Sequence, residues 1–207
     1  MASNRRRIGL FGGSFDPVHN GHVKAARVAC GWASLDSVWF VPAATSPFKA
    51  GTTMATADHR LAMIRLAIAD EPDFSVSTVD LDRAGVSYAL DTVRLLKTRH
   101  PDVDFSFIIG ADSLVNLSKW REAHTLVGLC DFITLARPGW TFSRVPGFEG
   151  ETERRLRQGI IADFAETVSS SEIRRRVEQG ESLEGLVPPA VAQYIAQNGL
   201  YRKADLA

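Results

Sequence analysis

Short apolar runs alternate with longer segments of helical spacing along most of this chain. The apolar or β-branched runs predict strands at Ile8–Phe11, Ser37–Val41, Phe74–Val79, Phe105–Ile109 and Phe132–Leu135, with a final strand at Ile160–Val168. Apolar residues that recur every three to four positions predict helices at His19–Ala33, Ala55–Ala69, Tyr88–His100, Trp120–Leu126, Ser169–Gln179 and Pro188–Asn198. This alternation predicts an α/β fold, with a Rossmann-like doubly wound parallel sheet and a C-terminal helical cap.

Two segments without a regular apolar pattern separate these elements. Ala43–Ala57 contains Pro47 and Gly51, and its length predicts an active-site loop. Gly139–Gly150 contains two glycines and a proline, which predicts an excursion over the surface. We see no internal repeat, and therefore predict one domain over residues 1–207, with residues from about 160 to 207 forming its C-terminal part.

The charge balance narrows the class of partner. The 207 residues include 24 Lys and Arg against 24 Asp and Glu, which argues against binding nucleic acid by bulk electrostatics. Any anion site must therefore be local. No apolar stretch approaches the roughly 20 residues that span a bilayer, so we expect no membrane partner. Cys30 and Cys130 lie far apart and lack metal-ligand spacing, which predicts reduced core residues, a cytoplasmic location and no metal held by the protein.

The segment from Gly12 to His22 carries the most specific pattern in the chain. It reads Gly-Gly-Ser-Phe-Asp-Pro-Val-His-Asn-Gly-His and joins the first predicted strand to the first predicted helix. Glycines at such a junction let the backbone turn tightly and approach a ligand, and the helix that follows offers unpaired N–H groups to an anion. If the helix begins near His19, the rings of His19 and His22 lie on one face at that end. The segment predicts a phosphate site.

Two further residues follow the predicted strand at Phe105–Ile109. Asp112, after Gly110, can accept hydrogen bonds from sugar hydroxyls or can cap the next helix. Trp120 can stack on a flat ring or can pack in the core. The residues alone leave both alternatives open.

Two basic elements lie elsewhere in the chain. Ser169-Ser-Ser-Glu-Ile-Arg174 opens a predicted helix with serines and places an arginine one turn in, which predicts either a second anion site or a capped basic helix. Lys49, in the Ala43–Ala57 loop, can approach a phosphate as a point charge or can be a plain surface lysine.

Taken together, these segments resemble the nicotinate and nicotinamide mononucleotide adenylyltransferases of the His-x-x-His nucleotidyltransferase superfamily. The resemblance extends from about Arg7 to Tyr201. In that family the aspartate that matches Asp112 meets the adenosine ribose, and the tryptophan that matches Trp120 stacks on the pyridine ring. The chain departs from the family pattern at Phe48, where a histidine is usual, and at Ala89, where a threonine is usual.

The resemblance implies transfer of an adenylyl group from ATP to nicotinate mononucleotide, with Mg²⁺ carried by the ATP. It also leaves open nicotinamide mononucleotide or phosphopantetheine as the acceptor, a non-catalytic nucleotide sensor, and a homo-oligomeric state. The implied catalytic residues are His19, His22 and Arg174. The implied ATP-binding residues are Gly12, Gly13, Ser14, Phe15, Gly21, Gly110, Asp112, Arg137 and Ser170. The implied acceptor-binding residues are Asp16, Lys49, Tyr88, Ala89 and Trp120.

Overall fold

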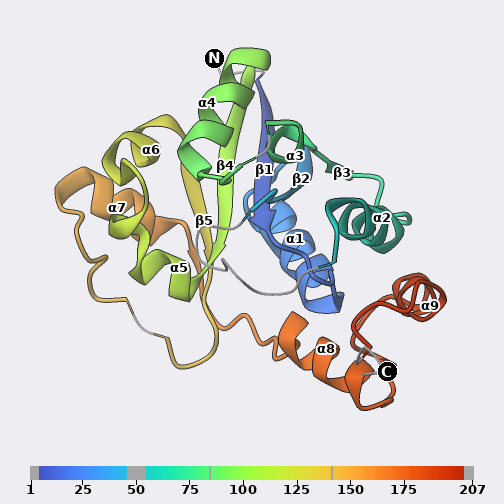
Figure 1. Cartoon of the computed structure of the whole chain (residues 1–207). Coiled ribbons are helices and arrows are strands. Elements are labelled where there is room, and N and C mark those ends of the chain that lie inside the picture. The colour runs from blue at the N-terminus through green and yellow to red at the C-terminus, as the bar shows by residue number, and fades with distance from the viewer. Residues whose placement is uncertain (1–4, 46–54, 84, 141, 203–207) are drawn as a thin grey trace.

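A computed structural model describes residues 5–45, 55–83, 85–140 and 142–202 of the chain (Figure 1). In these residues one sheet of parallel strands has the order β3-β2-β1-β4-β5-β6. The strands are β1 (Arg6–Gly13), β2 (Ser37–Pro42), β3 (Phe74–Val76), β4 (Val103–Gly110), β5 (Asp131–Leu135) and β6 (Ile160–Ile161). The strand order reverses direction between β1 and β4. This topology confirms the predicted doubly wound α/β fold, and such a reversal is where open parallel sheets bind their ligands.

Five helices agree with the predicted ranges to within two residues at each end. They are α1 (Asn20–Trp32), α2 (Ala57–Ala67), α4 (Ala89–Arg99), α8 (Ser170–Glu178) and α9 (Pro189–Gln197). The structure adds the short elements α3 (Val79–Arg83), α5 (Ala111–Val115), the 3-10 helix η1 (Leu117–Lys119), α6 (Ala123–Leu129) and α7 (Gly150–Gln158).

Two predicted elements have the predicted type but different bounds. The strand predicted at Phe74–Val79 ends at Val76, because Thr78 donates from its side chain to Asp82 and the chain turns into α3. The helix predicted at Trp120–Leu126 begins only at Ala123, because Glu122 before it adopts a left-handed backbone with φ of +46°.

The final strand predicted at Ile160–Val168 is limited to Ile160–Ile161. The excursion predicted at Gly139–Gly150 has no helix or strand in its described residues before Gly150, where α7 begins, and α7 itself was not predicted. Leu156 is the one buried residue of α7. A helix with a single buried position leaves no apolar period for sequence analysis to detect.

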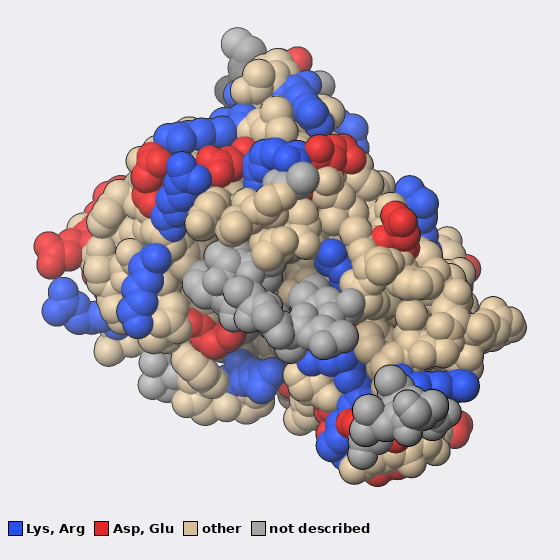
Figure 2. Space-filling view, viewed as in Figure 1, with Lys and Arg blue, Asp and Glu red and all other residues tan. Residues whose placement is uncertain are grey.

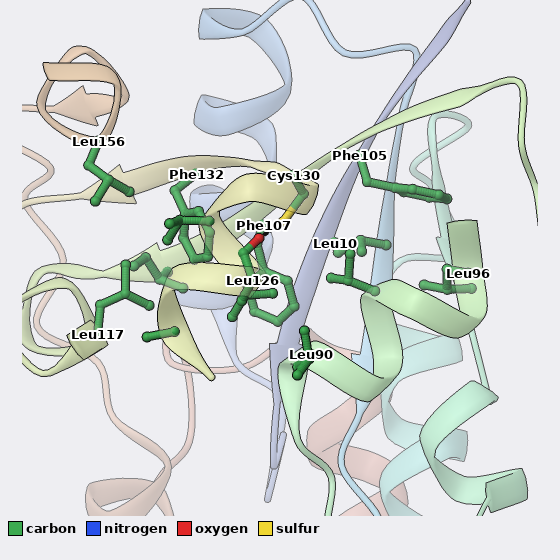
Figure 3. Packing of buried hydrophobic residues seen from close by; sticks show 14 of the residues in the cluster. Leu10, Leu90, Leu96, Phe105, Phe107, Leu117, Leu126, Cys130, Phe132 and Leu156 are labelled. Atoms are coloured by element: carbon green, nitrogen blue, oxygen red, sulfur yellow. Dashed lines mark hydrogen bonds between the residues drawn. The ribbon is translucent and has the colours of Figure 1, made fainter. Parts of the chain in front are cut away.

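The sheet separates two apolar cores, one on each face. Leu10 and Phe107 point into the core beneath α4 and α6, where Figure 3 shows Phe107 among Leu90, Leu126 and other labelled side chains. Phe40 and Ile108 point into the opposite core, which includes residues of α1, α2 and α9. This alternation follows from the two-residue period of a strand. Both faces of the central strands are therefore buried, so a functional site is expected at the ends of these strands.

Two smaller observations bear on the composition argument. Cys130 is buried and Cys30 is half-buried, and both are free thiols. Within the described ranges, no helix has the length and apolar character needed to cross a membrane.

Candidate active site

A cavity of about 750 Å³ opens at the carboxyl ends of β1 and β4, where the strand order reverses. Figure 2 shows a hollow near the middle of this face, with positive and negative side chains interspersed around it. The predicted site residues that line the cavity are Gly12, Gly13, Ser14, Tyr88, Ala89, Gly110, Asp112 and Trp120. The fold therefore brings together residues from four separate parts of the sequence.

The structure places Gly12 and Gly13 in a strand and not in the predicted turn. Gly12 and Gly13 remain in β1, and the turn falls at Phe15, whose φ is +50°. A Cβ on Gly12 would lie 3.1 Å from the Phe107 ring, and one on Gly13 would lie 3.0 Å from the Phe15 ring. The prediction of a tight turn at these glycines is therefore wrong, because both lie in the strand and two aromatic rings crowd the space that a Cβ would take. Both line the cavity, so their close approach to a ligand stays a prediction. The Phe15 side chain is buried, so only its backbone can meet a ligand.

The two histidines lie together at the start of α1, as their spacing predicts. His19 is the N-cap of the helix and His22 is three residues on. Their rings stack with centroids 3.7 Å apart, and the backbone N–H of His19 donates to Nδ1 of His22 at 3.2 Å. Because Nδ1 accepts this bond, the neutral His22 ring carries its proton on Nε2. His22 is thus oriented as a hydrogen-bond donor through Nε2.

His19 is held in a less polar environment. It is 6% exposed, and burial lowers its pKa to about 4, although the charge of Glu166 acts in the opposite direction. Its ring is therefore neutral near pH 7. A Cβ on Gly21 would lie 2.7 Å from the Glu166 side chain and 3.0 Å from Nδ1 of His19. The absence of a side chain at Gly21 gives both groups room.

The Gly110–Asp112 element lines the cavity at the end of β4. Gly110 is the N-cap of α5, which excludes the alternative that Asp112 caps this helix. Asp112 is exposed in the first turn, and a Cβ on Gly110 would lie 2.7 Å from its Oδ1 atom. Glycine at this position lets the Asp112 carboxylate face the cavity.

Trp120 lies at the end of η1, half-buried between core and cavity. Its ring meets Phe107 edge to face at a centroid distance of 6.1 Å, and the residue also lines the cavity. The two alternatives for this residue are therefore compatible, because one edge packs in the core and the remainder faces the open space.

The start of α4 also lines the cavity. Tyr88 is the N-cap of this helix and Ala89 is its first residue, so N–H groups of the first turn lack intrahelical acceptors. Arg121 lies over the Tyr88 ring at 4.9 Å from its centroid and pairs with Asp91 at 3.2 Å. Sequence analysis missed Arg121, although a basic residue directly after Trp120 is a usable signal.

The remaining predicted residues do not line the cavity within the described part of the chain. They include Phe15, Asp16, His19, Gly21 and His22, which follow β1 and lead into α1. Ser170 donates from its hydroxyl to the carbonyl of Pro17 at 2.9 Å, and Arg174 donates to the carbonyl of Asp16 at 2.6 Å. These bonds tie α8 to the segment between β1 and α1. Arg137 is exposed after β5, and Lys49 lies outside the described residues.

Two residues that sequence analysis did not place in the site also bind the segment between β1 and α1. Arg60 is 2% exposed and donates from Nη1 to the carbonyl of Ser14 at 2.8 Å. Burial lowers its pKa, and the Asp16 carboxylate partly offsets this effect. The Tyr201 hydroxyl donates to Oδ1 of Asp16 at 2.7 Å, and Asp16 is itself 3% exposed. In the sequence, Tyr201 stands out only as the end of the region that resembles the family. The signal available for Arg60 was an arginine on the buried face of α2.

Comparisons with solved structures support the fold. The nicotinic acid mononucleotide adenylyltransferase of Plasmodium falciparum, solved in complex with NaAD, is similar with a TM-score of 0.73 at 20% identity, covering 95% of this chain and 97% of that one. A nicotinate-nucleotide adenylyltransferase described as putative, from Vibrio parahaemolyticus, gives a TM-score of 0.69 at 17% identity, covering 96% and 97%.

Comparisons of sequence show the family. Residues 10–176 match the cytidylyltransferase-like family. The chain is 42% identical over 202 residues to the probable nicotinate-nucleotide adenylyltransferase of Bordetella avium, covering 96% of this chain and all of that protein. It is 39% identical over 196 residues to the nicotinate-nucleotide adenylyltransferase of Bacillus subtilis, covering 95% and 98%. The chain therefore belongs to the cytidylyltransferase-like family and, within it, to the nicotinate-nucleotide adenylyltransferases.

Proposed function

We propose that this protein transfers the adenylyl group of ATP to nicotinate mononucleotide, as a step of NAD biosynthesis. The products are nicotinate adenine dinucleotide and pyrophosphate. The observation that carries the proposal is the cavity at the β1–β4 reversal, which joins the backbone of Gly12–Ser14 to Asp112 and Trp120. Membership of the family, with relatives of that name about 40% identical over nearly the whole chain, supports the same reaction.

The reaction depends on the alignment of its two substrates more than on a general base. A phosphate oxygen of nicotinate mononucleotide attacks the α-phosphorus of ATP, a new P–O bond forms, and the bond to the bridging oxygen of the β-phosphate breaks as pyrophosphate leaves. The attacking group is already an anion near pH 7. Catalysis then comes from placing two polyanions in line and stabilising charge on the transferring group.

The segment that leads from β1 into α1 offers hydrogen-bond donors that suit the phosphate groups of the substrates. His22 presents a proton on Nε2, since its Nδ1 accepts from the backbone of His19. We assign His22 to the oxygens of the transferring phosphoryl group and the neutral His19 to orienting it. Ser14 and Phe15 contribute backbone N–H groups in this assignment. Arg174, one turn into α8 and bound to the carbonyl of Asp16, is assigned to the leaving pyrophosphate.

These donors are suited to anions. Imidazole, guanidinium and backbone N–H groups bind phosphate oxygens, whereas Mg²⁺ requires oxygen ligands. In the part of the chain that the structure describes, no three His, Cys, Asp or Glu side chains converge as a metal site. We therefore propose that Mg²⁺ arrives as part of the ATP substrate, where it neutralises phosphate charge.

The acceptor end favours a carboxylate on the pyridine ring. The first turn of α4 presents N–H groups beside Ala89, and the guanidinium of Arg121 lies next to Tyr88. Both features attract a negative group. A nicotinate ring that stacks on Trp120 would meet them with its carboxylate, whereas the carboxamide of nicotinamide carries no charge. We place the reaction in the cytoplasm, consistent with two free thiols in the described chain.

The test is pyrophosphate release from Mg²⁺–ATP with three acceptors: nicotinate mononucleotide, nicotinamide mononucleotide and phosphopantetheine. We expect kcat/KM for nicotinate mononucleotide to exceed that for nicotinamide mononucleotide by about tenfold or more, which is about 1.4 kcal/mol of discrimination. Equal use of the two pyridine nucleotides would contradict the assigned carboxylate contact. Turnover with phosphopantetheine alone would contradict the role of Trp120, and no turnover with any acceptor would indicate a nucleotide sensor.

A further inference from the structure

The chain beyond α9 returns to the phosphate segment between β1 and α1. Tyr201, which follows α9, donates its hydroxyl to Oδ1 of Asp16 at 2.7 Å. The backbone N–H of Ala55 donates to the same carboxylate oxygen at 3.1 Å. Asp16 is 3% exposed, so its carboxylate is stabilised by these two donors and by the Arg174 guanidinium, 3.8 Å from Oδ2, rather than by water.

The hydrogen bond from Tyr201 joins two left-handed positions of the backbone. Phe15, next to Asp16, has a φ of +50°, and Tyr201 itself has a φ of +62°. Bulky residues adopt this conformation only where the surrounding structure imposes it. At Phe15 the core packing of the ring and the bonds to the neighbouring residues impose it.

Two guanidinium groups hold the carbonyls of the same turn. Arg60 donates to the carbonyl of Ser14 at 2.8 Å, and Arg174 donates to the carbonyl of Asp16 at 2.6 Å. In a trans peptide the carbonyl and the next N–H point in opposite directions. The bond from Arg60 therefore fixes the direction of the N–H of Phe15, which is one of the groups assigned to the ATP phosphates.

We propose that Tyr201 is a positioning residue for adenylyl transfer: through Asp16 it holds the turn at Phe15 in the conformation that aims the backbone N–H groups at the phosphates. This inference rests on the proposed function for its catalytic consequence. Tyr201 touches no substrate in this scheme, and it acts from the segment after α9 on a residue 185 positions earlier in the chain. Removal of its hydroxyl loosens the turn while the aromatic ring keeps its packing.

The test compares Tyr201→Phe with the matched control Tyr194→Phe. Tyr194, on α9, hydrogen-bonds through its hydroxyl to Nδ1 of His59 at 2.9 Å, so each variant loses one hydroxyl contact of the C-terminal segment. We expect Tyr201→Phe to lower kcat about tenfold, because small displacements of aligned groups cost large factors in rate. We expect Tyr194→Phe to stay within about twofold of the wild type.

A second measurement reports on the turn without turnover. In hydrogen–deuterium exchange, the amides of residues 14–16 should exchange faster in Tyr201→Phe and stay unchanged in Tyr194→Phe. In the double variant with Asp16→Ala, Tyr201→Phe should add little further loss of kcat, because Asp16→Ala already removes the oxygen that accepts from the Tyr201 hydroxyl.

Equal kcat and equal exchange at residues 14–16 in the two tyrosine variants would overturn the inference. Additive losses of kcat in the double variant would also overturn it, because Tyr201 would then act elsewhere. Failure of the proposed function has a different signature: the wild type itself releases no pyrophosphate with nicotinate mononucleotide, while the exchange at residues 14–16 still reports whether Tyr201 holds the turn.

Discussion

The ring of His22 stacks on the ring of His19 at a centroid distance of 3.7 Å, and the N–H of His19 donates to Nδ1 of His22. This pairing gives the two histidines different characters. His19 is buried and neutral, with a pKa lowered to about 4, and its backbone orients its neighbour. His22 is left with a proton on Nε2, which is the form that donates to a phosphate oxygen.

The first prediction follows from this orientation. His22→Ala should lower kcat by about 10²-fold or more, the scale of losing one donor to the transition state. Steady-state pyrophosphate release measures it. His100→Ala is the control, since His100 lies at the opposite end of α4 from the cavity. A change below about threefold in kcat/KM for His22→Ala would remove this residue from the proposed mechanism.

Trp120 is predicted to act on the acceptor more than on ATP. Trp120→Ala should weaken binding of nicotinate mononucleotide by about 1–3 kcal/mol, or about 5- to 160-fold, if the pyridine stacks as a base does. Calorimetric titration of both substrates measures the effect. Trp140→Ala serves as the control, because Trp140 is 43% exposed and lies outside the cavity lining. Unchanged affinity for the acceptor would leave Trp120 as a core residue only.

Gly110 is predicted to be required for the ribose contact. In Gly110→Ala the new Cβ would lie 2.7 Å from Oδ1 of Asp112, so the carboxylate must move. We expect the KM for ATP to rise about tenfold, within the range of losing a hydrogen bond to a charged group.

A matched substitution separates this effect from a general one. Gly128→Ala, in α6, places its Cβ in open space and should leave the KM for ATP unchanged. Because the clash at Gly110 involves only the end of a side chain, the melting temperature of Gly110→Ala should also stay close to that of the wild type. An unaltered KM for ATP would exclude Asp112 from nucleotide binding.

The buried His19 makes a prediction about acid stability. Its pKa is lowered from 6.5 to about 4 by burial, so between these values the unfolded chain binds a proton that the folded chain does not. The stability that this neutral ring provides is complete above about pH 6.5 and is lost as the pH falls toward 4, by at most about 3 kcal/mol.

Urea unfolding of the wild type and of His19→Asn, at about pH 7 and about pH 4.5, isolates this contribution. The free energy of unfolding of the wild type, relative to the variant, should be lower at the acidic pH. A difference between the two proteins that does not change with pH would show that His19 titrates normally in the folded state.

Much of the fold was accessible from local signals. The two-residue and three-to-four-residue apolar periods located β1, β2, β4 and β5 and five of the helices, since burial on a face dictates the spacing of apolar residues. The strand at Ile160–Ile161 was too short, and α7 too polar, for any period to delimit them. The helix after Trp120 was misplaced because the left-handed backbone of Glu122 leaves no periodic trace.

By itself, the sequence determined the parallel α/β architecture, the paired histidines at the start of α1, and the nearness of the Gly110 element to a ligand-binding strand end. Each of these depends on residues close together in the chain. Only the tertiary structure decided that aromatic rings crowd Gly12 and Gly13, that Arg60 is buried against Ser14, and that Tyr201 reaches Asp16. Those contacts join segments far apart in sequence, and their geometry exists only once both sheet faces are packed and the C-terminal helices have docked.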